Sequence, residues 1–434
     1  MSSKIGFWSV FALVAGSQIG SSVFMQPAIL APYGIYAMFG WVISATGAIS
    51  LALIFSWLCA KFPKTGGPYV YVQEAFGQTA GFFTGWTYWV ISWVSTPVLY
   101  IAAAAYLSPL LNNPPIQVLL LIELFLLFSL TALNLRGVSA AGKAEFFLSL
   151  LKIIPLIVIP IFALSFFNID NFMIDTTNAQ TGKLSDILGS TALLTLWGFI
   201  GVETVTTTAG SVKNPSKTIP LALVSGTMCV AFLYIINSFS IMGLMPGALL
   251  SQSRAPYVDA AQLIFGGNWH LLISLIAAIT CIGTANAWTL SSGQAALGLA
   301  QDGLLPAFFN KKNKNGAPFW GLMTSCIGIV PILLLTMNES LTAQINMIID
   351  FSVTAFLFVY LASLAAFFKI YFREKNPRQL PYLLAGILGS LFCLWVLWET
   401  SITTIILASL FCLSGLPVYF FLNKVPKTIK ARIC

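Results

Sequence analysis

Four ionisable side chains lie inside long apolar runs of this sequence, where charge is costly. Glu123, Glu203, Asp350 and Lys152 each fall within a stretch of about 20 largely apolar residues. An ionisable group at that depth in a membrane costs several kcal/mol unless it is paired or faces water, so each one marks a candidate functional site. A buried carboxyl such as Glu203 can also change its protonation near neutral or mildly acidic pH, which suits a proton-linked gate.

Each of these residues has a plainer interpretation. Glu123 lies in an aliphatic run with no break nearby, so a structural hydrogen bond explains it equally well. Glu203 could be a permanently protonated acid of the core. Lys152 could extend its stem to a membrane surface, although it lies about two helical turns from the ends of its run.

Two apolar runs are interrupted near their middle by glycine and small polar residues. The first run contains segment 16–24 (GSQIGSSVF), and the sixth contains segment 197–203 (WGFIGVE). Corresponding breaks in two halves of a chain point to a transporter site near the membrane midplane. The unwound backbone must line a cavity, where its free N–H groups favour an anion such as a substrate carboxylate. Close helix packing is the alternative, and the pattern Gly16-x-x-x-Gly20 fits it.

The composition defines the elements that must position these residues. The chain has 434 residues, of which 58% are hydrophobic and 8% are charged, and its mean hydropathy is +0.89. These values exclude a water-soluble globule. The runs are apolar on nearly every face, which excludes the alternating pattern of a transmembrane β-barrel. We predict an all-α polytopic membrane protein.

Hydropathy predicts twelve membrane spans. They lie at about 7–30, 36–60, 80–108, 117–135, 144–167, 185–209, 219–243, 271–298, 319–337, 342–370, 382–399 and 401–422. With the N-terminus in the cytoplasm, 18 of the 21 basic residues fall in inner loops and tails. The positive-inside rule therefore predicts that both termini are cytoplasmic. The net charge of +8 follows from this topology and does not indicate nucleic acid as a partner.

Other classes of site have little support in the sequence. The seven cysteines occur singly with no CxxC pair, so we expect neither a disulfide framework nor a zinc site. His270 is the sole histidine and no HExxH motif occurs, so we expect no metal and no cofactor. A polytopic membrane enzyme and an ion channel are rival classes, but the first would need a catalytic constellation and the second a filter-like repeat.

Several motifs resemble signatures of the amino acid–polyamine–organocation superfamily. They are segments 16–24, 62–71, 197–203, 212–215 and 300–306. The chain is most similar to the amino acid/polyamine antiporters, particularly bacterial arginine/agmatine antiporters. The resemblance implies a LeuT-like fold of two inverted five-span repeats, with helices 1 and 6 broken. We expect one transporter domain at 1–422, with repeats at about 7–167 and 185–370, peripheral helices at about 382–422, and a basic cytoplasmic tail at 423–434.

The resemblance also implies a substrate site at the two breaks. The first-span backbone would hold the substrate carboxylate, and two sixth-span carbonyls would accept from its α-amino group. Trp197 would close the site from outside, and Trp288 would stack a substrate side chain with a cation–π attraction of about 0.5–2 kcal/mol. The first-span residues are Ser17, Ile19, Gly20, Ser21 and Ser22, the carbonyls are those of Phe199 and Ile200, and further substrate contacts are expected at Ile91, Ser92, Thr96 and Ser352.

Further positions match the gate and coupling residues of related transporters. Glu203, Tyr88 and Tyr360 match an inner hydrogen-bonded gate of the antiporters. Lys152 departs from the arginine antiporters but matches a fifth-span lysine of many sodium-independent relatives, where the ammonium stands in for a sodium ion. Thr96 stands where arginine antiporters carry asparagine, so arginine selectivity is not implied.

We therefore predict a sodium-independent amino acid transporter of the inner membrane. It would exchange a cationic amino acid, such as arginine, ornithine or lysine, for a related amine such as agmatine or putrescine. A proton-coupled symporter of neutral amino acids is the alternative. Lys152 favours it, as does an apolar distal pocket at Ile91, Thr96 and Leu99. The expected partners are the small-molecule substrate and membrane lipid, and a homodimer is compatible with the sequence.

Overall fold

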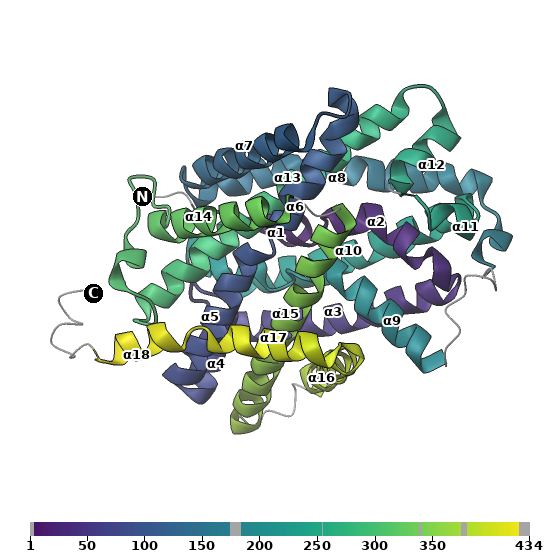
Figure 1. Ribbon diagram of the computed structural model, residues 1–434. Helices are drawn as coiled ribbons and strands as arrows, with labels where there is room; N and C mark the ends of the chain where they lie inside the picture. Colours follow the sequence, from purple (N-terminus) through teal and green to yellow (C-terminus); the bar gives the residue numbers. More distant parts are fainter. Residues whose placement is uncertain (1–3, 174–183, 254, 338–340, 375–379, 425–434) are drawn as a thin grey trace.

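The computed structural model describes residues 4–173, 184–253, 255–337, 341–374 and 380–424 (Figure 1). Within these ranges, twelve helical stretches are long and apolar enough to cross a membrane. The predicted all-α class and the twelve spans are confirmed. Most of the predicted tail, residues 425–434, lies outside the described residues, as does the side chain of Asp350.

Five spans are interrupted or extended by a second helical segment, and seven are single helices. The first five spans are α1 (Phe7–Gln18) with α2 (Ser21–Leu30), α3 (Tyr36–Lys61), α5 (Gln78–Val94) with α6 (Pro97–Leu107), α7 (Ile116–Asn134), and α8 (Val138–Ala163) with the 3-10 turn η3 (Leu164–Phe166). The next five are α9 (Leu184–Leu196) with η5 (Trp197–Phe199) and η6 (Thr204–Ser211), α10 (Pro215–Leu244), α13 (Trp269–Gln301), α14 (Phe319–Thr336) and α15 (Leu341–Glu374). The last two are α16 (Leu380–Glu399), and α17 (Ile402–Leu413) with α18 (Leu416–Lys424).

The burial of the spans separates a central group from a peripheral one. The first and third spans are mostly buried inside the protein, whereas the twelfth is mostly exposed. The helices α16 to α18 lie at one margin of the bundle and contact it chiefly through α15 and α3 (Figure 1). The broken spans therefore lie where neighbouring spans can satisfy their backbone, as irregular backbone at membrane depth requires.

The first span breaks between Gln18 and Ser21, as the sequence predicts. Ile19 is extended, with φ −75° and ψ 91°, and Gly20 precedes α2 with no side-chain cap. The third span has a further discontinuity that we did not predict, at Ser95 and Thr96. Proline at position 97 explains it, because a proline cannot donate the helical hydrogen bond and favours the first position of a new helix.

The sixth span is interrupted at residues 200–203 and continues as a 3-10 helix. Gly201 has φ +106°, a conformation that only glycine adopts without strain. The eight-residue helix η6 contains four threonines, and each hydroxyl donates to the carbonyl three residues earlier over 2.6–2.8 Å. These local bonds reinforce a 3-10 helix that is longer than the usual three or four residues.

The two breaks meet at the centre of the bundle. Ser17 Oγ donates to the carbonyl of Gly201 over 3.0 Å, and Thr204 Oγ1 donates to Ser17 Oγ over 2.8 Å. At the end of η6 the N-terminal segment is joined to the sixth span by backbone bonds. The Ile5 N–H donates to Ser211 O (3.0 Å), and the Lys213 N–H donates to Ile5 O (2.9 Å). The broken helices predicted for spans one and six are therefore confirmed.

Candidate functional site

A small cavity lies where the breaks in spans one and six meet. It lies among the first, third, sixth and eighth spans. Of the predicted substrate residues, Ser17, Gly20, Ser21, Ser22, Trp197, Ile200 and Trp288 line it. Leu99, an expected third-span position, also lines it, together with three residues that we did not predict, Gln18, Ser95 and Thr284. Ser95 and Thr284 carried no recognisable signal in the sequence, because each lies in a helix with several other small polar residues.

The carbonyl groups of residues 16–19, at the end of α1, accept hydrogen bonds from side chains of other spans. A helix leaves its last carbonyls without an intrahelical partner. Trp288 Nε1 donates to Ser17 O (3.2 Å), and the Tyr234 hydroxyl donates to Gln18 O (2.7 Å). Thr284 Oγ1 donates to Ile19 O over 2.5 Å. Side chains of α10 and α13 therefore hold the end of α1 in place. Ile19 does not line the cavity, and its carbonyl is already hydrogen-bonded to Thr284.

The start of α2 presents N–H donors to the cavity. The first N–H groups of a helix have no intrahelical acceptor, and Gly20 supplies no side-chain cap for α2. Gly20, Ser21 and Ser22 line the cavity, and the Ser22 hydroxyl lies 3.2 Å from that of Tyr234. A ten-residue helix also places the positive end of its dipole here. This side of the cavity suits a carboxylate.

The sixth-span carbonyls differ from each other. Phe199 does not line the cavity, and its carbonyl accepts the Val202 N–H over 3.3 Å. Its ring packs against Trp41 and Tyr234. The carbonyl of Ile200 accepts no hydrogen bond within the described residues. Only Ile200 therefore retains the free acceptor that we expected at both positions.

Except for Leu99, the predicted third-span contacts do not line the cavity, and neither does the predicted tenth-span residue. Ile91, Ser92 and Thr96 are buried but do not line it. The hydroxyls of Ser92 and Thr96 bond to backbone carbonyls of their own helix, both over 2.7 Å. Ser352 Oγ is buried, has no hydrogen-bond partner among the residues that the structure describes, and lies outside the lining.

The predicted inner gate is partly assembled. The Tyr360 hydroxyl donates to Glu203 Oε2 over 2.6 Å and accepts from the Gly201 N–H over 3.4 Å. The Tyr88 hydroxyl pairs with Ser291 Oγ (3.1 Å) and also interacts with the Glu203 carboxyl group. Glu203 Oε1 has no hydrogen-bond partner among the described residues. Glu203 is thus tied to the sixth-span break and retains one oxygen for a proton.

Replacing Glu203 with glutamine is expected to flatten the pH dependence of transport while substrate binding survives. Glutamine keeps the shape and the acceptor that Tyr360 uses, but it cannot titrate. Transport rates between pH 5 and 8, together with calorimetric binding, provide the measurement. A variant that keeps the wild-type pH profile would remove Glu203 from the coupling.

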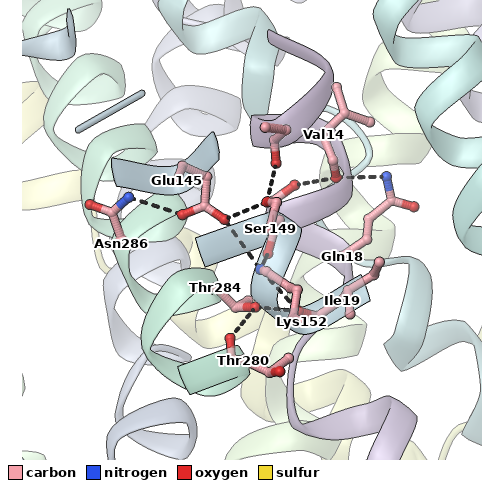
Figure 2. A network of polar contacts seen from close by, with 12 residues as sticks. Val14, Gln18, Ile19, Glu145, Ser149, Lys152, Thr280, Thr284 and Asn286 are labelled. Atoms are coloured by element: carbon pink, nitrogen blue, oxygen red, sulfur yellow. Dashed lines mark hydrogen bonds and ion pairs between the residues drawn. The ribbon is translucent and has the colours of Figure 1, made fainter. Parts of the chain in front are cut away.

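Lys152 contacts the broken first span directly (Figure 2). Its side chain is 0% exposed, and Nζ lies 3.2 Å from Gly16 O and 3.4 Å from Ile19 O. The snorkelling interpretation is therefore wrong. Nζ also forms an ion pair with Glu145 over 3.2 Å.

Glu145 is the buried acid that sequence reasoning missed. We placed the start of the fifth span at 144, so Glu145 fell at the expected membrane surface, whereas α8 begins at Val138. The signal was available, because Glu145 precedes Lys152 by seven residues, or about two helical turns on one face. Glu123 is buried on α7 and makes no hydrogen bond within the described residues, so a structural hydrogen bond for Glu123 gains no support.

Comparison with known proteins identifies the family. The sequence profile of the amino acid permease family matches residues 5–432. The chain belongs to the amino acid permease family. The predicted superfamily is therefore confirmed, and this permease is a multi-pass membrane protein that transports small molecules.

Three relatives illustrate the similarity. The chain is 31% identical to the cadaverine/lysine antiporter of Escherichia coli K12, over 97% of this chain and 95% of the relative. It is 28% identical to the putrescine transporter PotE of Haemophilus influenzae, over 97% of this chain and 98% of the relative. It is 27% identical to the PotE of Escherichia coli K12, over 84% and 83% respectively.

Proposed function

We propose that this permease is a sodium-independent antiporter that exchanges a cationic amino acid for its decarboxylated amine across the bacterial inner membrane. Lysine and cadaverine are the pair we favour, because a relative that matches almost the whole chain is a cadaverine/lysine antiporter. The observation that carries the proposal is the cavity at the two helix breaks, with N–H donors on one side and indole rings on another. An enzymatic role is not proposed, since the family consists of transporters.

The cavity offers complementary groups to each part of a cationic amino acid. The N-terminus of α2 would bind the carboxylate, and the free carbonyl of Ile200 would accept from the α-amino group. Trp288 and Trp197 would hold the cationic side chain. The amine product shares the chain and the terminal ammonium but lacks the carboxylate. One cavity can therefore bind both partners in turn, as exchange requires.

Lys152 supports the absence of sodium coupling. Its ammonium binds two carbonyl oxygens at the end of α1, where a free cation would otherwise be needed to offset them. Because the lysine is covalently attached, this positive charge is present without an added ion. We propose that it braces the first span in place of sodium.

The proposal also includes the two repeats, the cytoplasmic position of the termini and the contacts of the peripheral helices. The two repeats, at about 7–167 and 185–370, would supply one broken helix each, with peripheral helices at about 382–422. The distribution of basic residues supports cytoplasmic termini and a cytoplasmic tail at 423–434. The exposed outer faces of α16 and α17 would contact lipid or a second copy of the chain.

Proteoliposomes would test the proposed exchange. Uptake of labelled lysine is measured in vesicles loaded with cadaverine and in empty vesicles, each with sodium or choline outside. We expect uptake only into loaded vesicles and no effect of sodium. Uptake of a neutral amino acid into empty vesicles along a pH gradient would support the symporter, and no transport in any condition would reopen the enzyme class.

A symporter of neutral amino acids is a second candidate function, which the apolar and uncharged lining of the cavity favours. Among the described residues that line it there is no acidic side chain, and Leu99 makes part of the lining apolar. A cationic substrate would therefore depend on aromatic rings and on neutral oxygens for its distal ammonium. A neutral, apolar side chain would fit the same wall.

Replacing Trp288 with alanine is expected to weaken the binding of a cationic substrate more than the binding of a small neutral one. The indole contributes cation–π attraction as well as contact area, which amounts to about 1–2 kcal/mol, or roughly a five- to thirtyfold loss. Calorimetric binding of lysine and of alanine to purified protein is the measurement. Because Trp288 Nε1 also holds Ser17 O, Trp288→Phe serves as a control that loses this bond and keeps an aromatic face. Equal losses for both substrates would reduce Trp288 to a packing role.

A further inference from the structure

We propose that Glu145 is the counter-ion that keeps Lys152 a fixed cation during transport, so that the pair braces the broken first span and carries no proton. The proposal rests on the proposed exchange function and adds a positioning residue to it. It also decides between the two roles open to Lys152, a fixed strut and a proton carrier. The contacts of the pair, drawn in Figure 2, carry the inference.

The surroundings of Lys152 match an ammonium. Within the described residues its ammonium forms hydrogen bonds with the carbonyls of Gly16 and Ile19 and with the carboxyl oxygen Oε1 of Glu145. An ammonium has three N–H donors, one for each of these oxygens. A neutral amine would direct its lone pair at one of them. The ammonium also lies at the carbonyl end of α1, where the helix dipole favours a cation.

The surroundings of Glu145 match a carboxylate. Oε1 accepts from Lys152 Nζ (3.2 Å) and from Ser149 Oγ (3.3 Å), and Oε2 accepts from Asn286 Nδ2 (2.9 Å). The Asn286 amide is held in turn by Asn134 Nδ2, which donates to Asn286 Oδ1 over 3.0 Å. The Ser149 hydroxyl shares its one proton between Glu145 and the carbonyl of Ala12 (3.3 Å). Among the described residues Lys152 and Asn286 donate to Glu145, and these contacts stabilise its charged form.

The pair connects three spans at the first break. Both partners lie on α8 and both side chains are 0% exposed. Lys152 reaches α1, and Glu145 reaches Asn286 on α13. Glu145 also lies against Gly16, where a Cβ atom would overlap its carboxyl group. Close contact between α1 and this carboxylate is thus the reason for glycine at position 16.

Burial makes the two charges interdependent. A single buried charge is costly, and loss of either charge would leave its partner uncompensated. A proton can pass from Lys152 to Glu145 within the pair, but the total charge then stays at zero. The charge of Lys152 also acts on the Cys281 thiol, which lies on α13. The pair can therefore hold the break without adding a proton to the transport cycle.

A double-mutant cycle tests the charge pairing without any substrate. Thermal unfolding of the purified full chain is compared for the wild type, Lys152→Met, Glu145→Gln and the double variant. We expect each single variant to unfold at a clearly lower temperature and the double variant to recover most of the loss. Ser149→Ala is the matched control, because it removes a neutral contact to the same carboxyl oxygen and should change little. Losses that simply add in the double variant would overturn the proposal.

If the single variants do not fold, recovery of the double variant as folded protein is the supporting result. Failure of the double variant to fold as well would overturn the proposal. Because this assay uses no substrate, a failure of the proposed lysine/cadaverine exchange would leave its outcome unaffected.

Transport with simultaneous measurement of internal pH provides the second readout. In proteoliposomes that exchange lysine for cadaverine, each single variant should lose more than about 100-fold in exchange rate, because one buried charge is left uncompensated. The double variant should lie within about tenfold of the wild type. The ratio of protons moved to substrate moved should be the same in both. A changed ratio would make the pair a proton carrier, and near-normal exchange by Glu145→Gln would show that Lys152 needs no counter-ion.

Discussion

Replacing Gly16 with alanine is expected to destabilise the protein by about 3 kcal/mol or more and to abolish exchange. The new methyl group would occupy the position of the Glu145 carboxyl. Neither group can give way cheaply, because Gly16 lies in a helix and its carbonyl binds Lys152. Forcing the carboxylate aside combines overpacking with disruption of a buried ion pair. Thermal unfolding and lysine/cadaverine exchange are the measurements.

Gly142→Ala is the matched control for this prediction. Gly142 lies on α8 near the first span, but a Cβ atom there would be 3.5 Å from Ile5, at ordinary contact distance. Alanine should be tolerated at this position or slightly stabilising, since glycine weakens a helix interior. Similar behaviour of the two variants would mean that the contact between Gly16 and Glu145 is not the cause.

Replacing Gly201 with alanine is expected to reduce exchange by at least about tenfold. Alanine at φ +106° carries a backbone strain of about 1–3 kcal/mol. Its methyl group would also lie 3.1 Å from the Trp288 ring and 3.2 Å from Ser17 O, so it would push the two breaks apart. Exchange rates and substrate affinity in proteoliposomes are the measurements.

Gly77→Ala separates the strain at Gly201 from the contact. Gly77 has φ +89°, but a Cβ atom there would have no neighbour within 4 Å. This variant should lose some stability through strain and keep its substrate affinity. If Gly77→Ala impairs affinity as strongly as Gly201→Ala does, the loss does not arise at the junction of the breaks.

The spans and breaks could be predicted because they depend on local properties. Each span needs an apolar run of sufficient length, which is visible without knowledge of its neighbours. The break in span one requires glycine near the middle of such a run, and Gly20 supplies it. The bend in span three was missed because only Pro97 marks it, and proline is tolerated in membrane helices.

The partners of the broken backbone could not be predicted from the sequence. The Tyr234 hydroxyl donates to the carbonyl of Gln18. Nothing in the sequence near position 234 distinguishes this tyrosine from one at a lipid interface. Its role depends on the packing of α10 against α1, which is a long-range property. For Phe199 the prediction of a free carbonyl was wrong, because the Val202 N–H already donates to it. A matching motif shows which residue is present but not whether its carbonyl already has a donor.

The long 3-10 helix η6 has a mechanical consequence for the cytoplasm-facing end proposed above. A 3-10 helix rises about 2.0 Å per residue and an α-helix about 1.5 Å, so the eight residues of η6 are about 4 Å longer than the same residues wound as an α-helix. The chain beyond η6 is bonded to Ile5, just before α1. Rewinding η6 as an α-helix would therefore shorten it by this length. Because its end is bonded to Ile5, the start of α1 would move with it. A local change of helical pitch would thus displace two spans.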